Sequence, residues 1–312
     1  MIPTLWNFAF PTNLELNGLE STLERFANYP ASTIKDEIIS RLVGEIGIQG
    51  RIFRTLSKAS LTRYQGTIST STSDIIQTFE KFKNSDLKVN SLNIIKLDLT
   101  IAELLKECDL IRSGYGDIQI SLQKISTNIQ SHKSTIQSEK DSLVQSIENL
   151  RYHARNEKLD AIKSGIVAGF GIGSLSNATT FIMVPHFDCG LTLFATIFTG
   201  GLLGWYFGNK MSFKLNQEAG FKGQQLEHLK KSTVYIDGVI DDIKVFNDGV
   251  GLFETFWSRQ FDHVMATQGF IANARKVNVQ LNDLTIQSML ISWSNAKNAL
   301  DNYEKATQFI MN

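Results

Sequence analysis

The chain is predicted to be a mainly α protein, an elongated bundle of long antiparallel helices with a central apolar hairpin as its head. Three observations predict this fold. The only prolines are at positions 3, 11, 30 and 185, so the stretches 31–184 and 186–312 lack that helix breaker. Apolar residues recur at spacings of three and four through both stretches, as they do on one face of a helix. Between the two patterned stretches lies one long segment that is almost free of charge.

The uncharged segment is the most informative part of the sequence. It runs from Ser164 to Asn209, 46 residues with one formal charge, Asp188, in a chain that is 20% charged. A turn at 185–188 divides it into two arms of 20 residues, 165–184 and 189–208. A helix of that length spans about 30 Å, the thickness of the hydrocarbon core of a bilayer. The segment is therefore predicted to form a hairpin that inserts into a membrane.

Glycines recur every four residues on both arms of the predicted hairpin. If the chain reverses between His186 and Phe187, antiparallel pairing brings glycine opposite glycine at three levels. Such small-residue ridges let helix backbones approach closely in lipid. The residues expected to form the hairpin are Gly165, Gly169, Gly173, Phe181, Val184, Pro185, Phe187, Leu191, Phe194, Gly200, Gly204 and Gly208. Lys163 and Lys210 flank it as cations for the membrane interface.

This segment has alternative interpretations. A buried core hairpin in a soluble protein would have the same apolar arms. A phosphate-binding glycine loop fails on spacing, because Gly173 is followed by Leu175 and Ser176 instead of the required glycine. The residues near the tip, 179–184 and 191–197, are rich in β-branched and aromatic types and also suit a β-hairpin. The conformation of the hairpin therefore stays open between a helical hairpin and a β-tongue.

Long helices are predicted on both sides of the hairpin. An apolar stripe from Ile94 to Ile111 follows 3-4-3-4-3 spacing, and Gly114-Tyr115-Gly116 is expected to break it, with Asp117 capping a new helix of roughly 45 residues. A second long helix is expected at 210–247, ended by a turn at Gly249-Val250-Gly251. The aromatic face that follows is expected to be core: Phe253, Phe256, Trp257, Phe261 and Val264, followed by Leu281, Leu284, Ile291 and Trp293.

The N-terminal region is predicted in less detail. A short helix is expected before Pro30, and Thr33 with Asp36 resembles a capping box that opens the next helix. The polar run 65–73 is expected to interrupt it. The chain is thus divided into N-terminal helices (1–163), the membrane-inserting hairpin (164–209) and C-terminal helices (210–312).

Composition excludes several function classes. Lys+Arg and Asp+Glu are equal at 31 each, so no net charge favours nucleic acid. The five histidines are scattered, and Cys108 and Cys189 are far apart, so neither a metal site nor a cofactor is expected. Glu139, Asp141, Glu148 and Glu157 fit a solvated helix face better than a catalytic site, and an enzyme is not expected. The N-terminus shows no secretory signal peptide.

This layout resembles the α-helical pore-forming toxins of the cytolysin A class, which include tripartite enterotoxin components and two-component xenorhabdolysins. The resemblance implies a secreted, water-soluble form in which long helices cover the apolar head, and a pore form in which protomers assemble after the head enters a target membrane. It thereby implies a cytolytic or haemolytic toxin whose partners are membrane lipid and other toxin subunits. The hairpin is too apolar to line a water-filled pore alone. This chain is therefore also interpreted as one component of a multi-component toxin.

Two rival functions have the same sequence pattern. A constitutive membrane-hairpin protein with coiled-coil interaction helices would show the same hydropathy but would not purify without detergent. A soluble helical interaction protein would purify in water but would not insert into liposomes.

Overall fold

The computed structural model describes residues 13–28, 36–84, 91–171, 200–277 and 283–311, and all of these except Asp36 belong to helices. The helices are α1 (Asn13–Asn28), α2 (Glu37–Arg63), the π-helical turn η2 (Tyr64–Ile68), α3 (Ser69–Asn84), α4 (Ser91–Gly171), α5 (Gly200–Val277) and α6 (Asp283–Met311). The predicted mainly α fold is confirmed for the described part of the chain, which contains no strand.

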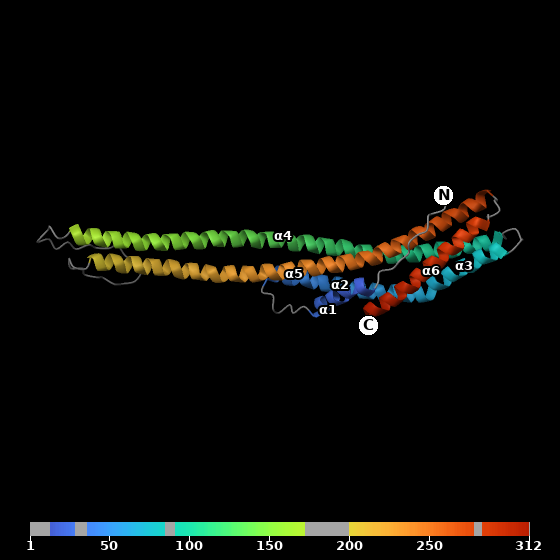
Figure 1. Ribbon diagram of the computed structural model, residues 1–312, viewed down its shortest axis with the longest axis horizontal. Coiled ribbons are helices and arrows are strands. Elements are labelled where there is room, and N and C mark those ends of the chain that lie inside the picture. The colour runs from blue at the N-terminus through green and yellow to red at the C-terminus, as the bar shows by residue number, and fades with distance from the viewer. Residues whose placement is uncertain (1–12, 29–35, 85–90, 172–199, 278–282, 312) are drawn as a thin grey trace. The chain divides into compact units, whose positions relative to one another are not determined.

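The chain divides into two compact units (Figure 1). Unit 1 comprises Met1–His132 and Ile236–Asn312, and unit 2 comprises Lys133–Tyr235. Helices α4 and α5, with 81 and 78 residues, each contribute to both units. In unit 1, α1, α2, α3 and α6 pack with the neighbouring parts of α4 and α5. In unit 2, α4 and α5 run side by side in opposite directions (Figure 1).

Helix α2 packs antiparallel to α4 within unit 1. Three cross-helix contacts show this, because residue numbers rise along α2 as they fall along α4: Asp36 with His132, Ser57 with Tyr115, and Arg63 with Glu107. Asp36 is the N-cap of α2, where its Oδ1 accepts hydrogen bonds from the backbone N–H groups of Ile38 and Ile39. Partial burial acts to raise the pKa of Asp36, but hydrogen bonds from His132 and Ile39 outweigh it and lower the pKa.

The core of unit 1 is aromatic. Phe53 of α2 meets Phe253 of α5 edge to face with ring centroids 5.3 Å apart, and the ring of Tyr303 in α6 lies 5.8 Å from that of Phe253. Trp257 and Tyr303 are both fully buried, with centroids 5.1 Å apart. Each such pair adds about 0.5–1.5 kcal/mol beyond the burial of its area. The aromatic face predicted from 253 onward is therefore core, except that Ile291 is 46% exposed and Phe261 is half-buried under Arg112.

The two turns predicted at glycine pairs are wrong. Helix α4 is continuous through Gly114-Tyr115-Gly116, so Asp117 caps nothing, and α5 is continuous through Gly249-Val250-Gly251. Gly114, Gly249 and Gly251 serve close packing instead, whereas a Cβ at Gly116 would meet no atom within 4 Å. A Cβ at Gly114 would lie 2.9 Å from Leu56, and one at Gly249 would lie 2.8 Å from Leu19. Tyr115 itself is fully buried and continues the apolar stripe between Ile111 and Ile118.

The N-terminal predictions are partly confirmed. The short helix before Pro30 is α1, which buries Leu16, Leu19, Leu23 and Phe26. An ion pair also holds it to α5, where Nη2 of Arg25 lies 2.6 Å from Oδ1 of Asp242. The predicted interruption at 65–73 corresponds to the π turn η2, whereas 69–73 already belong to α3.

Candidate functional site

The predicted hairpin begins as helix on both arms. Helix α4 extends to Gly171 and so contains Gly165 and Gly169, while α5 starts at Gly200 and contains Gly204 and Gly208. The predicted hairpin residues Gly173, Phe181, Val184, Pro185, Phe187, Leu191 and Phe194 lie outside the described residues. Among the helices as far as they are described, none combines the length and apolar character of a membrane span.

Cations gather at the base of this hairpin. Lys163 lies in α4 and Lys210 in α5. Lys210 is exposed, as are Lys214 one turn further along α5 and Arg155 and Lys158 on α4. Glu157 and Asp160 are exposed on α4 as well, so the surface is mixed there but purely cationic along 209–217 of α5. Cations in this position suit the head-group region of a membrane.

A narrow seam of small and apolar residues joins α4 to α5 in unit 2. Ile147 and Ala154 of α4 and Ser212 and Ala219 of α5 are buried there. A cross-helix hydrogen bond from Nζ of Lys222 to Oγ of Ser146, 2.6 Å long, ties the two helices beside the seam. Two helices bury only one stripe each, so the remaining faces of both helices in unit 2 are left to solvent or to partners.

Several large apolar side chains stand on those outer faces. Tyr152 of α4 is 63% exposed, and Phe213, Phe221 and Val234 of α5 are 69%, 67% and 73% exposed. Leu159 of α4 is 46% exposed. These side chains fall outside the apolar stripe, so the sequence pattern does not single them out. The sequence feature that could have identified them is an aromatic or aliphatic residue at a position that the apolar stripe assigns to solvent.

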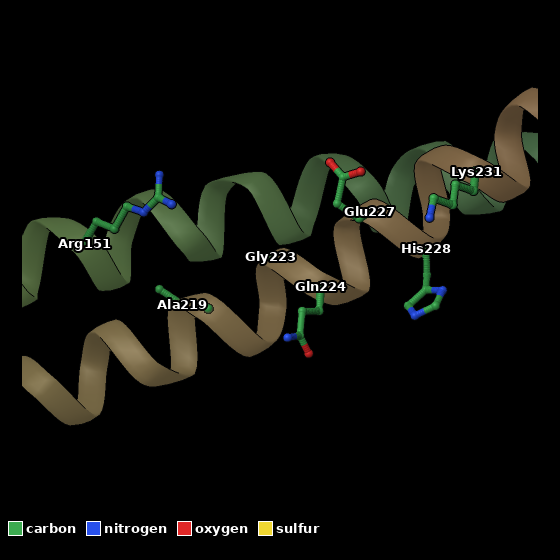
Figure 2. A pocket seen from close by; sticks show the side chains of 8 residues that line it. Arg151, Ala219, Gly223, Gln224, Glu227, His228 and Lys231 are labelled. Carbon is green, nitrogen blue, oxygen red and sulfur yellow. The ribbon is translucent and has the colours of Figure 1, made fainter.

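A shallow groove of about 440 Å³ crosses the outer side of α5 beside Arg151 of α4. Figure 2 shows Ala219 and Gly223 on α5, with Gln224 and His228 pointing away from α4. Gly220 and Gly223 form its floor, and a Cβ added at either glycine would meet no atom within 4 Å. Glu227 and Lys231 complete the lining.

The titratable side chains do not assemble into a metal site within the described ranges. No group of three His, Cys, Asp or Glu side chains is placed there to hold a metal ion. Nε2 of His132 lies 2.7 Å from Oδ2 of Asp36, and Nε2 of His263 lies 2.8 Å from the hydroxyl of Ser292. Burial lowers the pKa of His263 to about 4 and raises the pKa of the Cys108 thiol, so both groups are neutral near pH 7.

The four acidic residues of α4 that were predicted to be solvated are exposed, although they lie on two opposite sides of the helix. Glu139, Asp141, Glu148 and Glu157 are all exposed in unit 2. Oδ1 of Asp141 accepts a hydrogen bond of 3.0 Å from the Gln137 side chain one turn earlier.

No protein-family model matches this sequence, and no curated protein matches it. Solved structures do match over nearly the whole chain. It is similar to XaxA from Xenorhabdus nematophila, with a TM-score of 0.55, 9% identity and 96% of each chain covered. It is similar to the YaxAB pore complex, with a TM-score of 0.53, 12% identity, and 96% of this chain and 95% of that one covered.

A third match is the SmhB pore of the tripartite α-pore-forming toxin Smh from Serratia marcescens. The TM-score is 0.50 at 11% identity, with 95% of this chain and 98% of that one covered. At such identities the likeness establishes a shared fold, and that fold is the helical one predicted from the sequence.

Proposed function

We propose that this chain, which has the fold of the α-pore-forming toxins, is itself a pore-forming toxin or one component of a multi-component pore-forming toxin. In this proposal the hairpin 164–209 inserts into a target membrane and the protomers oligomerise. The observation that carries the proposal is the position of the uncharged segment. It covers the end of α4, the stretch 172–199 and the start of α5, the two helices that run antiparallel in unit 2.

The length of the segment supports insertion. Each arm has 20 residues, enough for about 30 Å of helix, and α4 and α5 already extend as helix into the two arms. Continuation of both helices toward the tip would satisfy every backbone hydrogen bond within the arm, as a bilayer requires. Lys163 and Lys210 would then lie at the near interface of the membrane.

The glycines support a close pairing of the arms. Gly169 of α4 and Gly204 of α5 are proposed to face one another at the middle level of the ridges predicted from the sequence. Helices in lipid gain nothing from apolar burial against each other, so their association depends on such close packing. The glycine ridges would hold the two arms together after they leave the soluble fold.

Partners are proposed on two grounds. The structures with this fold include the YaxAB pore complex and the SmhB pore of a tripartite toxin. The arms of the hairpin are apolar on all sides, whereas a water-filled pore needs a polar lining. We therefore favour a toxin component that anchors in the membrane while other subunits supply polar surface. A water-soluble form would be released before insertion, and the proposal requires no catalytic group or cofactor.

The test is release of a dye from phosphatidylcholine vesicles that contain phosphatidylserine. The purified chain is added alone and together with any protein encoded beside it. We expect the protein to be soluble without detergent. We expect dye release under at least one of these two conditions. Gly169→Leu should reduce release by separating the arms, while Gly238→Leu, an open glycine of α5 in unit 1, should not.

Two results would refute the proposal. Protein obtained only in detergent would indicate a constitutive membrane protein. Soluble protein that neither binds nor permeabilises vesicles, alone or with the neighbouring protein, would indicate a helical interaction protein.

A further inference from the structure

We propose that neighbouring copies of this chain join side by side through two different outer faces of unit 2. One face belongs to α4 and carries Tyr152 and Leu159. The other belongs to α5 and carries Gly220 with Phe213. This inference rests on the proposed function, because it identifies the contact through which the copies assemble.

The face on α4, here called the tyrosine face, consists of Asp141, Glu148, Tyr152 and Leu159. Spacings of seven, four and seven residues place all four on one stripe, roughly 120° around the helix from buried Ile147 at 100° per residue. All four are exposed. The tyrosine face therefore points away from the seam with α5 and presents two apolar side chains toward the hairpin and two carboxylates further from it.

The face on α5, here called the glycine face, consists of Phe213, Gly220, Gly223, His228 and Lys231. Gly220 and Gly223 are the floor of the groove, where bare backbone faces open space. Phe213 stands one heptad before Gly220 on the same stripe and is 69% exposed. His228 and Lys231 line the opposite end of the groove (Figure 2). The glycine face thus runs from apolar near the hairpin, through a hollow, to a charged end, where the carboxylate of Glu227 lines the groove together with His228 and Lys231.

The two faces match in order and in spacing. Along α4, Asp141, Tyr152 and Leu159 are separated by 11 and then 7 residues. Along α5, Lys231, Gly220 and Phe213 are also separated by 11 and then 7, in the opposite chain direction. These intervals correspond to about 16 Å and about 10 Å of helix. When two copies lie side by side in this register, Asp141 meets Lys231, the ring of Tyr152 enters the hollow at Gly220, and Leu159 meets Phe213.

The tyrosine face and the glycine face also lie at the same level along the helix axes of unit 2. Arg151, the residue before Tyr152, lines the same groove as Gly220 and Gly223. In a closed ring, rotation about an axis parallel to the helices brings equal heights of neighbouring copies together. Tyr152 of one copy would then meet the groove of the next with little axial shift. A tyrosine is also a favourable anchor, since it buries a large area with few rotatable bonds.

A second copy fits better than an unrelated partner because the complementary faces are both present on one chain. The contact is heterologous, since the two faces differ, and repeated heterologous contacts give rings or open filaments. Charge complementarity favours the pairing of unlike faces over the pairing of like faces. Asp141 on one face opposes Lys231 on the other, whereas the reverse pairing of like faces would place the carboxylates of Asp141 and Glu148 against those of the next copy.

The test uses disulfide formation between copies on vesicles. Tyr152→Cys and Gly220→Cys variants are prepared separately, together with the double variant and a control, Gln225→Cys, which is exposed on the other flank of α5. After mild oxidation on phosphatidylcholine–phosphatidylserine vesicles, a mixture of the two single variants should give a disulfide-linked dimer. Each variant alone should give no more than the parent chain with its own Cys108 and Cys189. The double variant should give a ladder of oligomers, because each copy links to two neighbours.

A second variant fills the groove. Gly220→Leu adds a side chain where nothing lies within 4 Å, so the fold should be kept, but the hollow for Tyr152 is lost. Vesicle leakage should fall by about tenfold or more, with an unchanged helical circular dichroism spectrum. Gly238→Leu, equally open on the same helix, should leak like the parent.

The outcomes separate this inference from the proposed function. Leakage without the mixed dimer would keep the function and overturn the two faces. The mixed dimer without leakage would keep the faces and overturn the function. A dimer formed by Tyr152→Cys alone would show a like-to-like contact and overturn the inference. The inference would also be overturned if Gly220→Cys formed a crosslink only to a second protein and none to Tyr152→Cys. Absence of both dimer and leakage would overturn the two together.

Discussion

The phenolic oxygens of Tyr115 in α4 and Tyr303 in α6 lie 3.2 Å apart in the interior of unit 1, where both side chains are fully buried. Ser57 and Ser60 of α2 complete the cluster, with the hydroxyl of Ser57 3.2 Å from Tyr115 and that of Ser60 bonded to Tyr303. Burial raises the pKa of both tyrosines. Three helices distant in sequence are therefore joined by hydroxyl groups that must stay neutral.

The first prediction concerns alkaline pH. Tyrosine ionises near pH 10 in the unfolded chain but at higher pH in the native core, so the native state binds these protons more tightly. Stability should be fully present below about pH 10 and fall as the pH rises further. In Tyr115→Phe/Tyr303→Phe this fall should be much smaller, while stability at pH 7 drops by about 1–3 kcal/mol from the lost hydrogen bonds. Urea unfolding at several pH values measures both effects. An unchanged alkaline slope in the double variant would contradict the prediction.

A second prediction concerns acid. His263 is buried, its ring lies tilted against that of Trp293 with centroids 4.6 Å apart, and burial lowers its pKa to about 4. His263 takes up a proton near pH 6.5 in the unfolded chain but only near pH 4 in the native chain. The free energy of unfolding should therefore fall as the pH is lowered from about 6.5 to about 4. The integrated loss is about 3 kcal/mol at most. His263→Gln, which retains a hydrogen-bonding group beside Ser292, should flatten this part of the profile. Thermal unfolding between pH 7 and pH 4 gives the comparison, with His153→Gln, an exposed site, as control.

Close approach at Gly249 provides a third prediction. A Cβ there would lie 2.8 Å from a side chain, Leu19, that is only 1% exposed and has no room to move. Overpacking of this kind destabilises by about 1–3 kcal/mol, and the better helix propensity of alanine recovers at most about 1. Gly249→Ala should therefore lower the free energy of unfolding by about 1 kcal/mol or more. Gly238→Ala, with open space around it, should raise it slightly. Equal effects of the two substitutions in urea would show that α1 does not dock as described.

The N-cap of α2 gives the fourth prediction. Asp36 caps the helix and also contacts His132, so Asp36→Ala removes two interactions at once. We expect a loss of about 1–2 kcal/mol. Asp36→Asn keeps an oxygen that can accept the capping hydrogen bonds and should lose less. Chemical denaturation monitored by circular dichroism would rank the three proteins. If Asp36→Asn were as unstable as Asp36→Ala, the contact with His132 would be the larger of the two interactions.

The fifth prediction tests traversal of the bilayer. Insertion would carry the tip of the hairpin across the hydrocarbon core, where each charge costs about 3 kcal/mol by insertion scales. Asp188 alone is a tolerable charge, but Phe187→Asp/Cys189→Asp adds two more. This variant should fold and bind vesicles, yet release no dye. Phe187→Leu/Cys189→Ser, which changes shape without charge, is the control. Full leakage from the charged variant would mean that the tip stays on the near side.

The long helices were predictable because their apolar residues repeat at helical spacing without proline. Leu97, Ile101, Leu104 and Ile111 are buried as that spacing predicts. Glycine misled the prediction, since a glycine at a tight turn and a glycine under a neighbouring side chain look alike in sequence. Only the position of Leu19, more than 200 residues away in sequence from Gly249, distinguishes the two.

The candidate site was predictable only in part. The uncharged segment and its flanking cations follow directly from composition, and both arms begin as helix in the described residues. The outer faces of unit 2 were not predictable in the same way. Phe213 and Tyr152 are apolar residues at positions that the stripe assigns to solvent, and only their exposed fractions show that no other part of the described chain covers them. The N-cap of α2 shows the same limit, since it is Asp36 itself and not Thr33.

The π turn at Tyr64–Ile68 has a consequence for how α2 and α3 tolerate change in length. A π turn holds one residue more than the regular helix around it, so it acts as an insertion absorbed within a helical run. That extra residue keeps Tyr64 and Ile68 both buried and delivers Ile75 and Phe79 to the same core. Loss of one residue there would restore a regular helix but turn the buried side of α3 by about 100° relative to α6. The length of this segment is therefore as constrained as its composition, even though nothing in its polar sequence suggests it.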